Sequence, residues 1–220
     1  MLPAPSVVVF DVNESLSDLA PMAERFTAVG ADPGLVGAWF ASVLRDGFAL
    51  TVVGRCPRFA DVAAANLLAL LPGGRDAVGE VLAGFPKLPL HPDVAPGVAA
   101  LRSDGWRLAT LSNGSVGVAE SLLGAAGIRD QFDQLLSVDD AGRWKPAPAA
   151  YLYAARSLGV APARMVLVAC HPWDIQGASA AGLRTAYLDR RGGPWPVVFD
   201  PPEWSAGSLP ELAAALGPAA

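Results

Sequence analysis

The chain has 220 residues, of which 52% are hydrophobic and 17% charged, which excludes a large multidomain assembly and a disordered chain and suits one domain with at most an inserted module. The net charge of −5 and the scattered arginines argue against binding to nucleic acid or anionic membranes. Two cysteines, Cys56 and Cys170, and two histidines are too few for a zinc finger or a disulfide scaffold. The sequence has no recognisable signal peptide and no run of roughly 20 apolar residues, so we expect a cytoplasmic protein that does not span a membrane.

Five short apolar segments are predicted to be parallel strands, because each is rich in aliphatic residues and runs into polar residues at its C-terminal end. In chain order these are residues 6–10, 106–111, 135–138, 165–169 and 184–188. Helical stretches are predicted between them, at 116–126, 148–158 and 175–181. This alternation predicts an α/β fold with a doubly wound parallel sheet, in which ligands bind beyond the carboxyl ends of the strands.

A different pattern separates the first predicted strand from the second. Between residues 19 and 88 apolar side chains recur at helical spacing, and no parallel strand is recognisable. We therefore expect an inserted helical cap at 19–88 and an α/β core formed by 1–18 and 89–220. Prolines between 86 and 96 mark the return to the core, and 192–208 is predicted to be a connection ahead of a last short helix at 209–216.

Polar groups follow the predicted strands and could act together in one site. Asp11 follows the first strand, Ser112 and Asn113 the second, and Lys145 and Asp174 come later. A strand-end carboxylate with a lysine and a second carboxylate nearby indicates covalent catalysis, because the lysine keeps the attacking carboxylate ionised. Glycine-rich dinucleotide or phosphate loops and the nucleophile elbow of serine hydrolases do not occur in the sequence.

These positions resemble the motifs of the haloacid dehalogenase superfamily. The matching segments are Phe10-Asp11-Val12-Asn13-Glu14-Ser15-Leu16, Leu111-Ser112-Asn113-Gly114-Ser115, Lys145-Pro146 and Trp173-Asp174, in this order. The chain is most similar to the type II L-2-haloacid dehalogenases. The resemblance implies the α/β core with an inserted cap, and a homodimer, which is common in this branch.

The residue two positions after Asp11 separates two reactions of the superfamily. Superfamily phosphatases carry a second aspartate there, which protonates the leaving alkoxide. This chain has Asn13, whose amide cannot donate a catalytic proton, whereas halide leaves without one. The resemblance therefore implies that Asp11 displaces halide from a short 2-haloalkanoic acid without a cofactor. The ester on Asp11 is then hydrolysed by water, and a 2-hydroxyalkanoic acid is released.

Two alternatives stay open. One is a magnesium-dependent phosphatase acting on a small phosphate ester, with Asp11, the carbonyl of Asn13 and Asp174 around the Mg²⁺ ion. The other is a catalytically silent binding protein that keeps the fold, an alternative that Glu14 and Phe40 leave open because both depart from the family pattern.

The resemblance implies a role for each matching side chain. Asp11 is the nucleophile and Lys145 its cationic partner, while Asp174 holds Lys145 and orients the attacking water. Ser112 and Asn113 donate hydrogen bonds to the substrate carboxylate or to the oxyanion of ester hydrolysis.

Further residues are assigned to the site from their places in the motifs. Ser15 corresponds to a hydroxyl residue that binds the nucleophile loop, and Tyr151 to a substrate-side tyrosine; Asn13 is counted with the substrate-binding residues. Glu14 stands where the family often has glycine. His171 stands where it often has asparagine, and we expect it to face Asp11 and to bind the departing halide.

The cap departs from the pattern at Phe40. Many family members have an arginine after the tryptophan at this point, which binds the substrate carboxylate, and here Arg45 or Arg55 could replace it. The pocket is predicted to be walled by aromatic side chains, namely Trp39, Phe40, Phe59 and Trp173. Such walls predict a narrow, mostly apolar pocket that favours haloacetates over longer acids.

Overall fold

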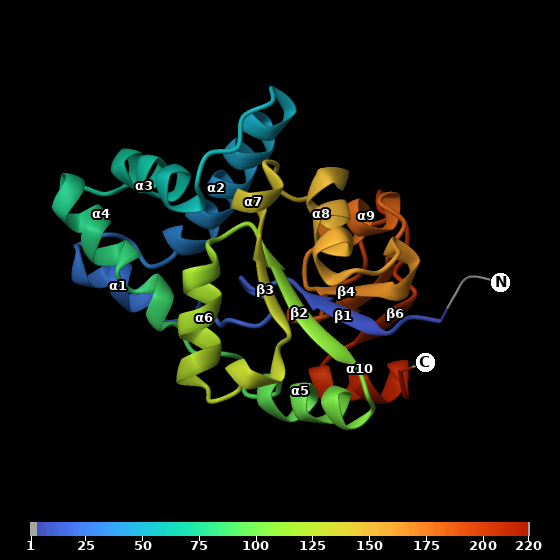
Figure 1. The fold of residues 1–220 in the computed structure, drawn as a ribbon. Coiled ribbons are helices and arrows are strands. Elements are labelled where there is room, and N and C mark those ends of the chain that lie inside the picture. The colour runs from blue at the N-terminus through green and yellow to red at the C-terminus, as the bar shows by residue number, and fades with distance from the viewer. Residues whose placement is uncertain (1–3, 220) are drawn as a thin grey trace.

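The computed structural model describes residues 4–219 and contains a six-stranded parallel sheet flanked by helices (Figure 1). The strand order is β3-β2-β1-β4-β5-β6. The strands are β1 Val7–Phe10, β2 Arg107–Ser112, β3 Gln134–Ser137, β4 Met165–Ala169, β5 Arg184–Leu188 and β6 Trp204–Ala206. The predicted doubly wound α/β fold is confirmed.

The register of the central strands brings their carboxyl ends to one edge of the sheet. Phe10, the last residue of β1, pairs with Thr110 in β2 and with Val168 in β4. The loops that begin at Asp11, Asn113 and the end of β4 therefore leave the sheet side by side. This is the edge at which open α/β sheets bind ligands.

Helices cover both faces of the sheet, and the side chains of β1 alternate between them as the period of two requires. Val7 and Val9 share a buried cluster with α8 and α9, whereas Val8 and Phe10 share another with α5 and α10. The core helices are α5 Val94–Ser103, α6 Val116–Ala125, α7 Val138–Ala141, α8 Pro148–Leu158, α9 Pro172–Ala180 and α10 Leu209–Leu216. Short 3₁₀ turns lie at η1 Phe85–Lys87, η2 Arg129–Gln131 and η3 Pro162–Arg164.

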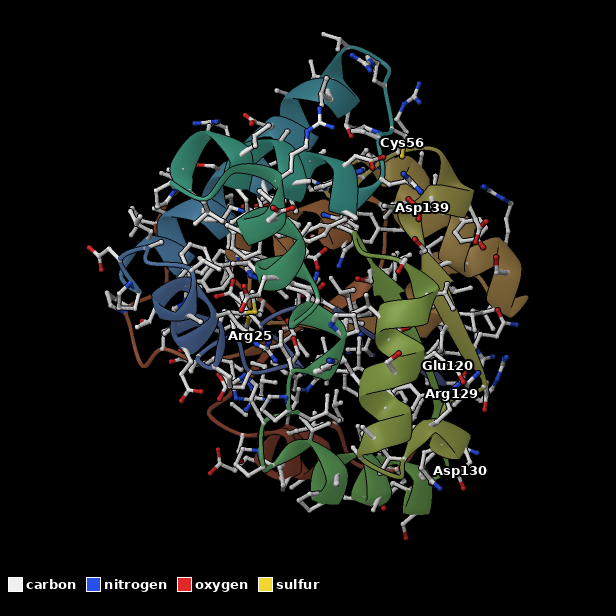
Figure 2. All side chains as sticks on the ribbon, turned by 90° about the vertical axis from the view of Figure 1, so that its left-hand side faces the viewer. Arg25, Cys56, Glu120, Arg129, Asp130 and Asp139 are labelled. Atoms are coloured by element: carbon white, nitrogen blue, oxygen red, sulfur yellow. The ribbon has the colours of Figure 1, made fainter. Side chains whose placement is uncertain are left out.

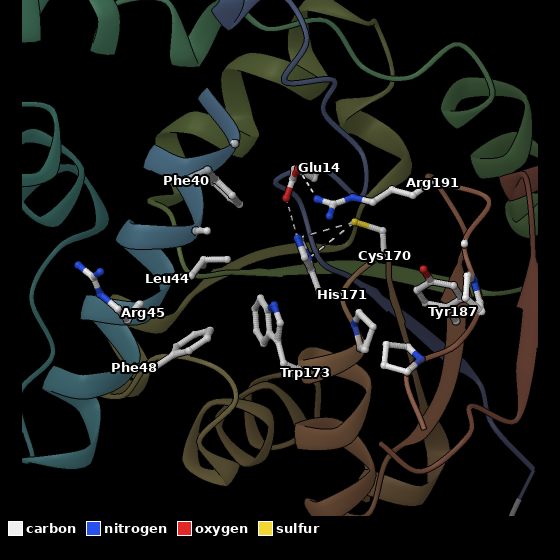
Figure 3. Close-up of a pocket in the computed structure, with 16 residues that line it drawn as sticks. Glu14, Phe40, Leu44, Arg45, Phe48, Cys170, His171, Trp173, Tyr187 and Arg191 are labelled. Carbon is white, nitrogen blue, oxygen red and sulfur yellow. Dashed lines mark hydrogen bonds and ion pairs between the residues drawn. The ribbon is translucent and has the colours of Figure 1, made fainter. Parts of the chain in front are cut away.

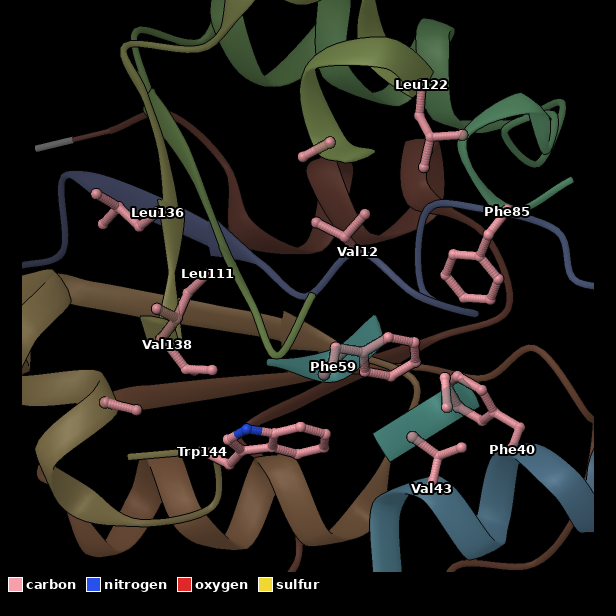
Figure 4. Close-up of a cluster of buried hydrophobic side chains, with 14 of the residues drawn as sticks. Val12, Phe40, Val43, Phe59, Phe85, Leu111, Leu122, Leu136, Val138 and Trp144 are labelled. Carbon is pink, nitrogen blue, oxygen red and sulfur yellow. The ribbon is translucent and has the colours of Figure 1, made fainter. Parts of the chain in front are cut away.

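The segment predicted as a cap is helical. Its helices are α1 Met22–Ala28, α2 Leu35–Val52, α3 Phe59–Leu70 and α4 Gly74–Leu82, and they lie beyond the carboxyl edge of the sheet (Figure 1). Their apolar side chains join those of the core in one cluster, in which Phe59 stacks on Trp144 at 5.8 Å (Figure 4). A Cβ atom on Gly47 would lie 2.2 Å from the Trp144 ring, so only glycine lets α2 approach this closely.

Two predicted elements need correction, and one helix was not predicted. The connection at 192–208 contains β6, an edge strand of three partly exposed residues that gives no apolar run in the sequence. The strand predicted at 135–138 ends at Ser137, because Val138 begins α7. Residues 94–103 form α5 although Pro96 lies within them, since proline is tolerated in the first turn of a helix.

Among the described residues, α2 is the one helix whose length and mean hydropathy would permit it to cross a membrane. Core helices of water-soluble proteins pass the same test. Its buried residues, among them Trp39 and Val43, pack in the shared cluster of cap and core.

Charged side chains project from the outer surface, as in the ion pair of 2.7 Å between Arg129 and Glu120 (Figure 2). Cys56 lies on this outer side near Asp139, far along the chain from Cys170, and both thiols are free. The structure thus contains no disulfide within residues 4–219.

Candidate active site

Asp11 is buried directly after β1, where three donors reach its carboxylate. The Ser15 hydroxyl donates to Oδ2 at 2.7 Å, and the Lys145 ammonium donates to Oδ1 at 2.8 Å. His171 Nδ1 lies 3.2 Å from Oδ2. Ser15 is held in turn by the backbone N–H of Cys170, which donates to its oxygen at 3.0 Å. The prediction that Lys145, Ser15 and His171 gather around Asp11 agrees with this geometry.

Lys145 is fully buried and bridges two carboxylates. Its ammonium lies 2.8 Å from Asp11 Oδ1 and 2.6 Å from Asp174 Oδ2. The side-chain oxygen of Asn113 accepts the Lys145 backbone N–H at 2.9 Å, and its amide donates to the Lys145 carbonyl at 3.3 Å. Asn113 therefore holds the backbone of Lys145 and does not point its amide at the pocket.

Asp174 lies in the first turn of α9 and is fully buried. Its second oxygen accepts a hydrogen bond of 2.5 Å from the Tyr151 hydroxyl. Tyr151 is itself fully buried, so its prediction as a substrate-side residue is wrong. Its hydroxyl instead positions the carboxylate of Asp174. A Cβ atom on Gly177 would lie 2.6 Å from the Tyr151 oxygen, so glycine in α9 makes room for this contact.

His171 lies between two carboxylates and two aromatic rings. Nδ1 faces Asp11 Oδ2, and Nε2 lies 2.9 Å from Glu14 Oε2. The ring stacks on Trp173 at 5.0 Å and on Phe40 at 6.5 Å. Because ionised carboxylates only accept hydrogen bonds, both ring nitrogens donate and the ring is an imidazolium.

Glu14 connects His171 to Arg191, as the dashed lines in Figure 3 show. Arg191 donates to Glu14 Oε1 at 3.0 Å from the loop after β5. Sequence reasoning missed Arg191, although the charged run Asp189-Arg190-Arg191 follows a predicted strand as the other site residues do. Glu14 adopts φ of 62°, a backbone conformation that glycine adopts far more readily than glutamate.

The buried charges shift one another's pKa. Burial alone raises the pKa of Asp11, but the charge of Lys145 and the hydrogen bond from His171 outweigh it and hold the pKa well below its ordinary value. Burial alone lowers the pKa of Lys145, yet Asp11 and Asp174 raise it above that of a free lysine. Burial raises the pKa of Asp174 despite the facing Lys145. Asp11 is thus ionised at neutral pH, as a nucleophile requires.

The same reasoning applies to the imidazole. Burial alone lowers the pKa of His171, but interactions with Cys170, Asp11 and Glu14 raise it well above its ordinary value. Burial raises the pKa of Glu14, and the contacts with His171 and Arg191 bring it below the ordinary value. The shifts agree with an imidazolium between two carboxylates.

The donor set does not fit Mg²⁺. All four carboxylate oxygens of Asp11 and Asp174 already accept hydrogen bonds, and the ammonium of Lys145 lies between the two groups. Within residues 4–219 no three His, Cys, Asp or Glu side chains gather as metal ligands would. Magnesium prefers several free oxygen ligands in octahedral geometry.

A cavity of about 900 Å³ opens between α2 and the loops that follow β4 and β5. Its walls are mostly apolar and include Phe40, Leu44, Phe48, Trp173 and Tyr187 (Figure 3). The floor toward Asp11 is formed by polar side chains, namely Glu14, His171 and Arg191. The prediction of a narrow pocket is therefore wrong, because this volume lies near the upper end of ordinary small-molecule sites.

Several predicted pocket residues lie elsewhere. Trp39 is fully buried among cap side chains, where its indole N–H donates to the Ala63 carbonyl at 3.2 Å, and Phe59 lies in the cluster of Figure 4, so neither lines the cavity. Arg45 does line the cavity, with its guanidinium 2.7 Å from Asp46, whereas Arg55 does not.

Two further predicted polar residues, Ser112 and Asn13, do not line the cavity. Ser112 Oγ accepts the N–H of Gly114 at 2.9 Å. The side-chain oxygen of Asn13 is buried and has no hydrogen-bond partner among residues 4–219. Their contact with substrate stays a prediction.

Comparisons with known proteins agree with this geometry. A family model described as haloacid dehalogenase-like hydrolase matches residues 8–182. The chain is 30% identical over 211 residues to (S)-2-haloacid dehalogenase 1 of Pseudomonas sp. (strain CBS-3), covering 93% of each chain. It is 36% identical over 106 residues to haloacetate dehalogenase H-2 of Moraxella sp. (strain B), covering 48% of this chain and 47% of that protein. A crystal structure of a dehalogenase with an intermediate complex superposes with a TM-score of 0.90 at 27% identity over 99% of both chains.

Proposed function

Since the chain belongs to the haloacid dehalogenase-like hydrolases, we propose that it hydrolyses 2-haloalkanoic acids to 2-hydroxyalkanoic acids through an ester on Asp11. The observation that carries this proposal is the carboxylate of Asp11, buried after β1 and held by Lys145, Ser15 and His171. A carboxylate placed in this way is ionised and oriented, and both are needed for displacement at carbon.

The first step forms the ester. A carboxylate oxygen of Asp11 attacks the halogen-bearing carbon, the carbon–halogen bond breaks, and the halide takes the bonding electron pair. His171 lies at the cavity floor with Nδ1 facing Asp11 and Nε2 facing Glu14, so its predicted hydrogen bond to the departing halide requires one of these N–H groups to leave its carboxylate. Such a donor matters most for fluoride, the poorest leaving group.

The second step cleaves the ester. Water attacks the carbonyl carbon of the ester on Asp11, and the bond between this carbon and the alkoxide oxygen of the product breaks. One proton of the water ends on the alkoxide and the other is released, so the 2-hydroxy acid and the carboxylate of Asp11 result. Lys145 stays beside the regenerated carboxylate and stabilises its charge. Asp174 keeps the ammonium in place from the other side.

A phosphatase is less supported. Its leaving alkoxide needs a positioned acid, and the family position for that acid is Asn13, while the carboxylates that would hold magnesium are bridged by Lys145. Loss of activity with EDTA and recovery with Mg²⁺ would instead support it.

The test is halide release from fluoro-, chloro- and bromoacetate and from both enantiomers of 2-chloropropionate, each with and without EDTA. We expect release that EDTA does not change, with the (S) enantiomer preferred, as the names of the similar proteins suggest. Absence of halide release from every one of these acids would contradict the proposal and favour the catalytically silent alternative.

A further inference from the structure

Glu14 and His171 form a carboxylate–imidazole pair on the cavity side of Asp11. Nε2 of the ring faces Glu14 Oε2 at 2.9 Å, and Nδ1 faces Asp11 Oδ2 at 3.2 Å. Both residues line the cavity, whereas Asp11 does not (Figure 3). The imidazole is therefore the polar group that lies between the cavity and the nucleophile.

Asp174 is poorly placed to activate water from the cavity. Its side chain is fully buried and does not line the cavity. One carboxylate oxygen accepts from Lys145 at 2.6 Å and the other from Tyr151 at 2.5 Å. A general base must reach the proton that it removes directly or through one water, and Asp174 has no such approach.

From this geometry, and resting on the proposed function, we propose that His171 is the general base of ester hydrolysis and that Glu14 is its positioning residue. The carboxylate of Glu14 holds Nε2–H and so fixes the ring with Nδ1 toward Asp11. Carboxylate–histidine pairs serve this orienting role in other hydrolases.

The protons balance over one cycle. Halide leaves as the ester forms on Asp11, and the proton on His171 Nδ1 passes to solvent, so the first step releases one proton with one halide. Water then adds its oxygen to the carbonyl carbon of the ester while Nδ1 takes one of its protons. The bond between this carbon and the alkoxide oxygen breaks, and the second proton of the water ends on the alkoxide. Ionised Asp11, the imidazolium and the 2-hydroxy acid result.

Ester formation itself prepares the base. The carboxylate of Asp11 is one of the groups that stabilise the imidazolium, and alkylation removes its charge. The N–H at Nδ1 then no longer faces a negative charge, while the N–H at Nε2 still donates to the carboxylate of Glu14. Other titratable or charged groups around the ring are Cys170, Tyr187, Arg45 and Arg191, with Lys145 behind Asp11.

The backbone of Glu14 supports a dedicated role. Its φ of 62° is a backbone conformation that residues other than glycine rarely adopt. Its carbonyl oxygen is also fixed by His91 Nε2 at 3.1 Å. The chain thus holds a glutamate in a strained position where it meets His171.

The experiment follows halide release and the mass of the intact protein after rapid mixing with excess (S)-2-chloropropionate. In His171→Asn we expect one equivalent of halide in a burst, then turnover slowed about 10²-fold or more, with the ester mass located on Asp11. Glu14→Gln should show the same pattern with a loss of about tenfold, since it keeps the ring but weakens its orientation. Added imidazole should speed ester hydrolysis in His171→Ala, because the cavity can admit it.

The matched control is Glu203→Gln, an exposed glutamate paired with Arg184 at 2.8 Å on the far edge of the sheet, which should keep the wild-type time course. If the wild type releases halide but His171→Asn hydrolyses the ester at the wild-type rate, or slows both steps equally without ester accumulation, the assignment of the base is overturned. If the wild type releases no halide, the proposed function fails, and this inference with it.

Discussion

Two cations and one hydroxyl hold the carboxylate of Asp11. Lys145 contacts Oδ1, and Ser15 shares Oδ2 with His171. A carboxylate that is both buried and ionised needs such partners, because desolvation alone favours the protonated form. The nucleophile is therefore prepared by side chains from three separate loops.

Asp11→Asn should abolish turnover while the fold is kept, because an amide is a far weaker nucleophile than a carboxylate. The measurement is halide release, together with circular dichroism as the control for folding. In the wild type, a single turnover in ¹⁸O-water should place the label on the Asp11 side chain. Label found only in the product would contradict the ester mechanism.

Lys145→Arg should lose about 10²- to 10³-fold in kcat although the charge is kept, a loss typical of removing one well-placed donor. The planar guanidinium cannot replace a compact ammonium that fits between two carboxylates. Steady-state kinetics with chloroacetate measures the effect. A variant with wild-type kcat would show that Lys145 lies outside the catalytic group.

The imidazolium of His171 should make stability depend on pH. The folded protein holds this proton more tightly than the unfolded chain, where the pKa is 6.5. Its contribution to the free energy of unfolding is therefore fully present below pH 6.5 and is lost as the pH rises through the raised folded pKa, at no more than about 1.4 kcal/mol per pH unit.

Urea unfolding from about pH 6 to 9 tests this contribution, because His171→Asn removes the titrating group. The wild type should lose stability over this range more steeply than the variant. Parallel curves for the two proteins would show that His171 is not charged in the folded state.

At the scale of elements, the close approach of helices α8 and α9 decides whether the site forms. Helix α9 packs on α8 with Gly177 against Tyr151, and this contact lets the tyrosine reach Asp174 at the start of α9. The site residues on α9 therefore depend on a residue that has no side chain.

Gly177→Ala should lower the free energy of unfolding by about 1–3 kcal/mol, since its Cβ would overlap Tyr151 and the backbone of Pro146. Activity should fall as well, because α9 carries Asp174. The matched control is Gly124→Ala in α6, where nothing lies within 4 Å of the new Cβ. That change should stabilise the protein by about 0.5–1 kcal/mol. Equal effects in denaturant unfolding would contradict the packing argument.

On the scale of the whole molecule, the cavity lies between cap and core. Helix α2 supplies one wall and the loops after β4 and β5 supply the other, so neither part encloses a substrate alone. Its volume of about 900 Å³ exceeds what a haloacetate needs. Substrate size is therefore set by side chains on the facing elements.

We expect longer 2-haloacids, such as 2-chlorobutyrate and 2-chlorohexanoate, to be used at least as well as chloroacetate. Leu44→Trp should reverse this order, because Leu44 lines the cavity and a larger side chain fills it. Leu68→Trp, at an exposed position of α3, is the control. The measurement is kcat/KM against chain length; an unchanged profile in Leu44→Trp would place the substrate elsewhere.

Local patterns in the sequence were sufficient for most of the sheet and for the nucleophile. Helices α8 and α10 match their predicted bounds, and five of the six strands were predicted within one residue of their ends at both termini, because apolar runs bounded by turns are local signals. The short edge strand β6 was not recognisable in the sequence, because it is extended through its pairing with β5 and not through a local apolar pattern. Asp11 and Lys145 were recognised from motifs although 134 positions separate them.

Only the tertiary structure decided what surrounds the nucleophile. Arg191 meets Glu14 across 177 positions, Tyr151 turns away from the substrate toward Asp174, and the cavity owes its width to the distance between α2 and the core loops. No periodicity or motif encodes such contacts. They arise because the carboxyl ends of parallel strands from distant parts of the chain converge on one edge, where packing and charge pairing settle which side chains face the cavity.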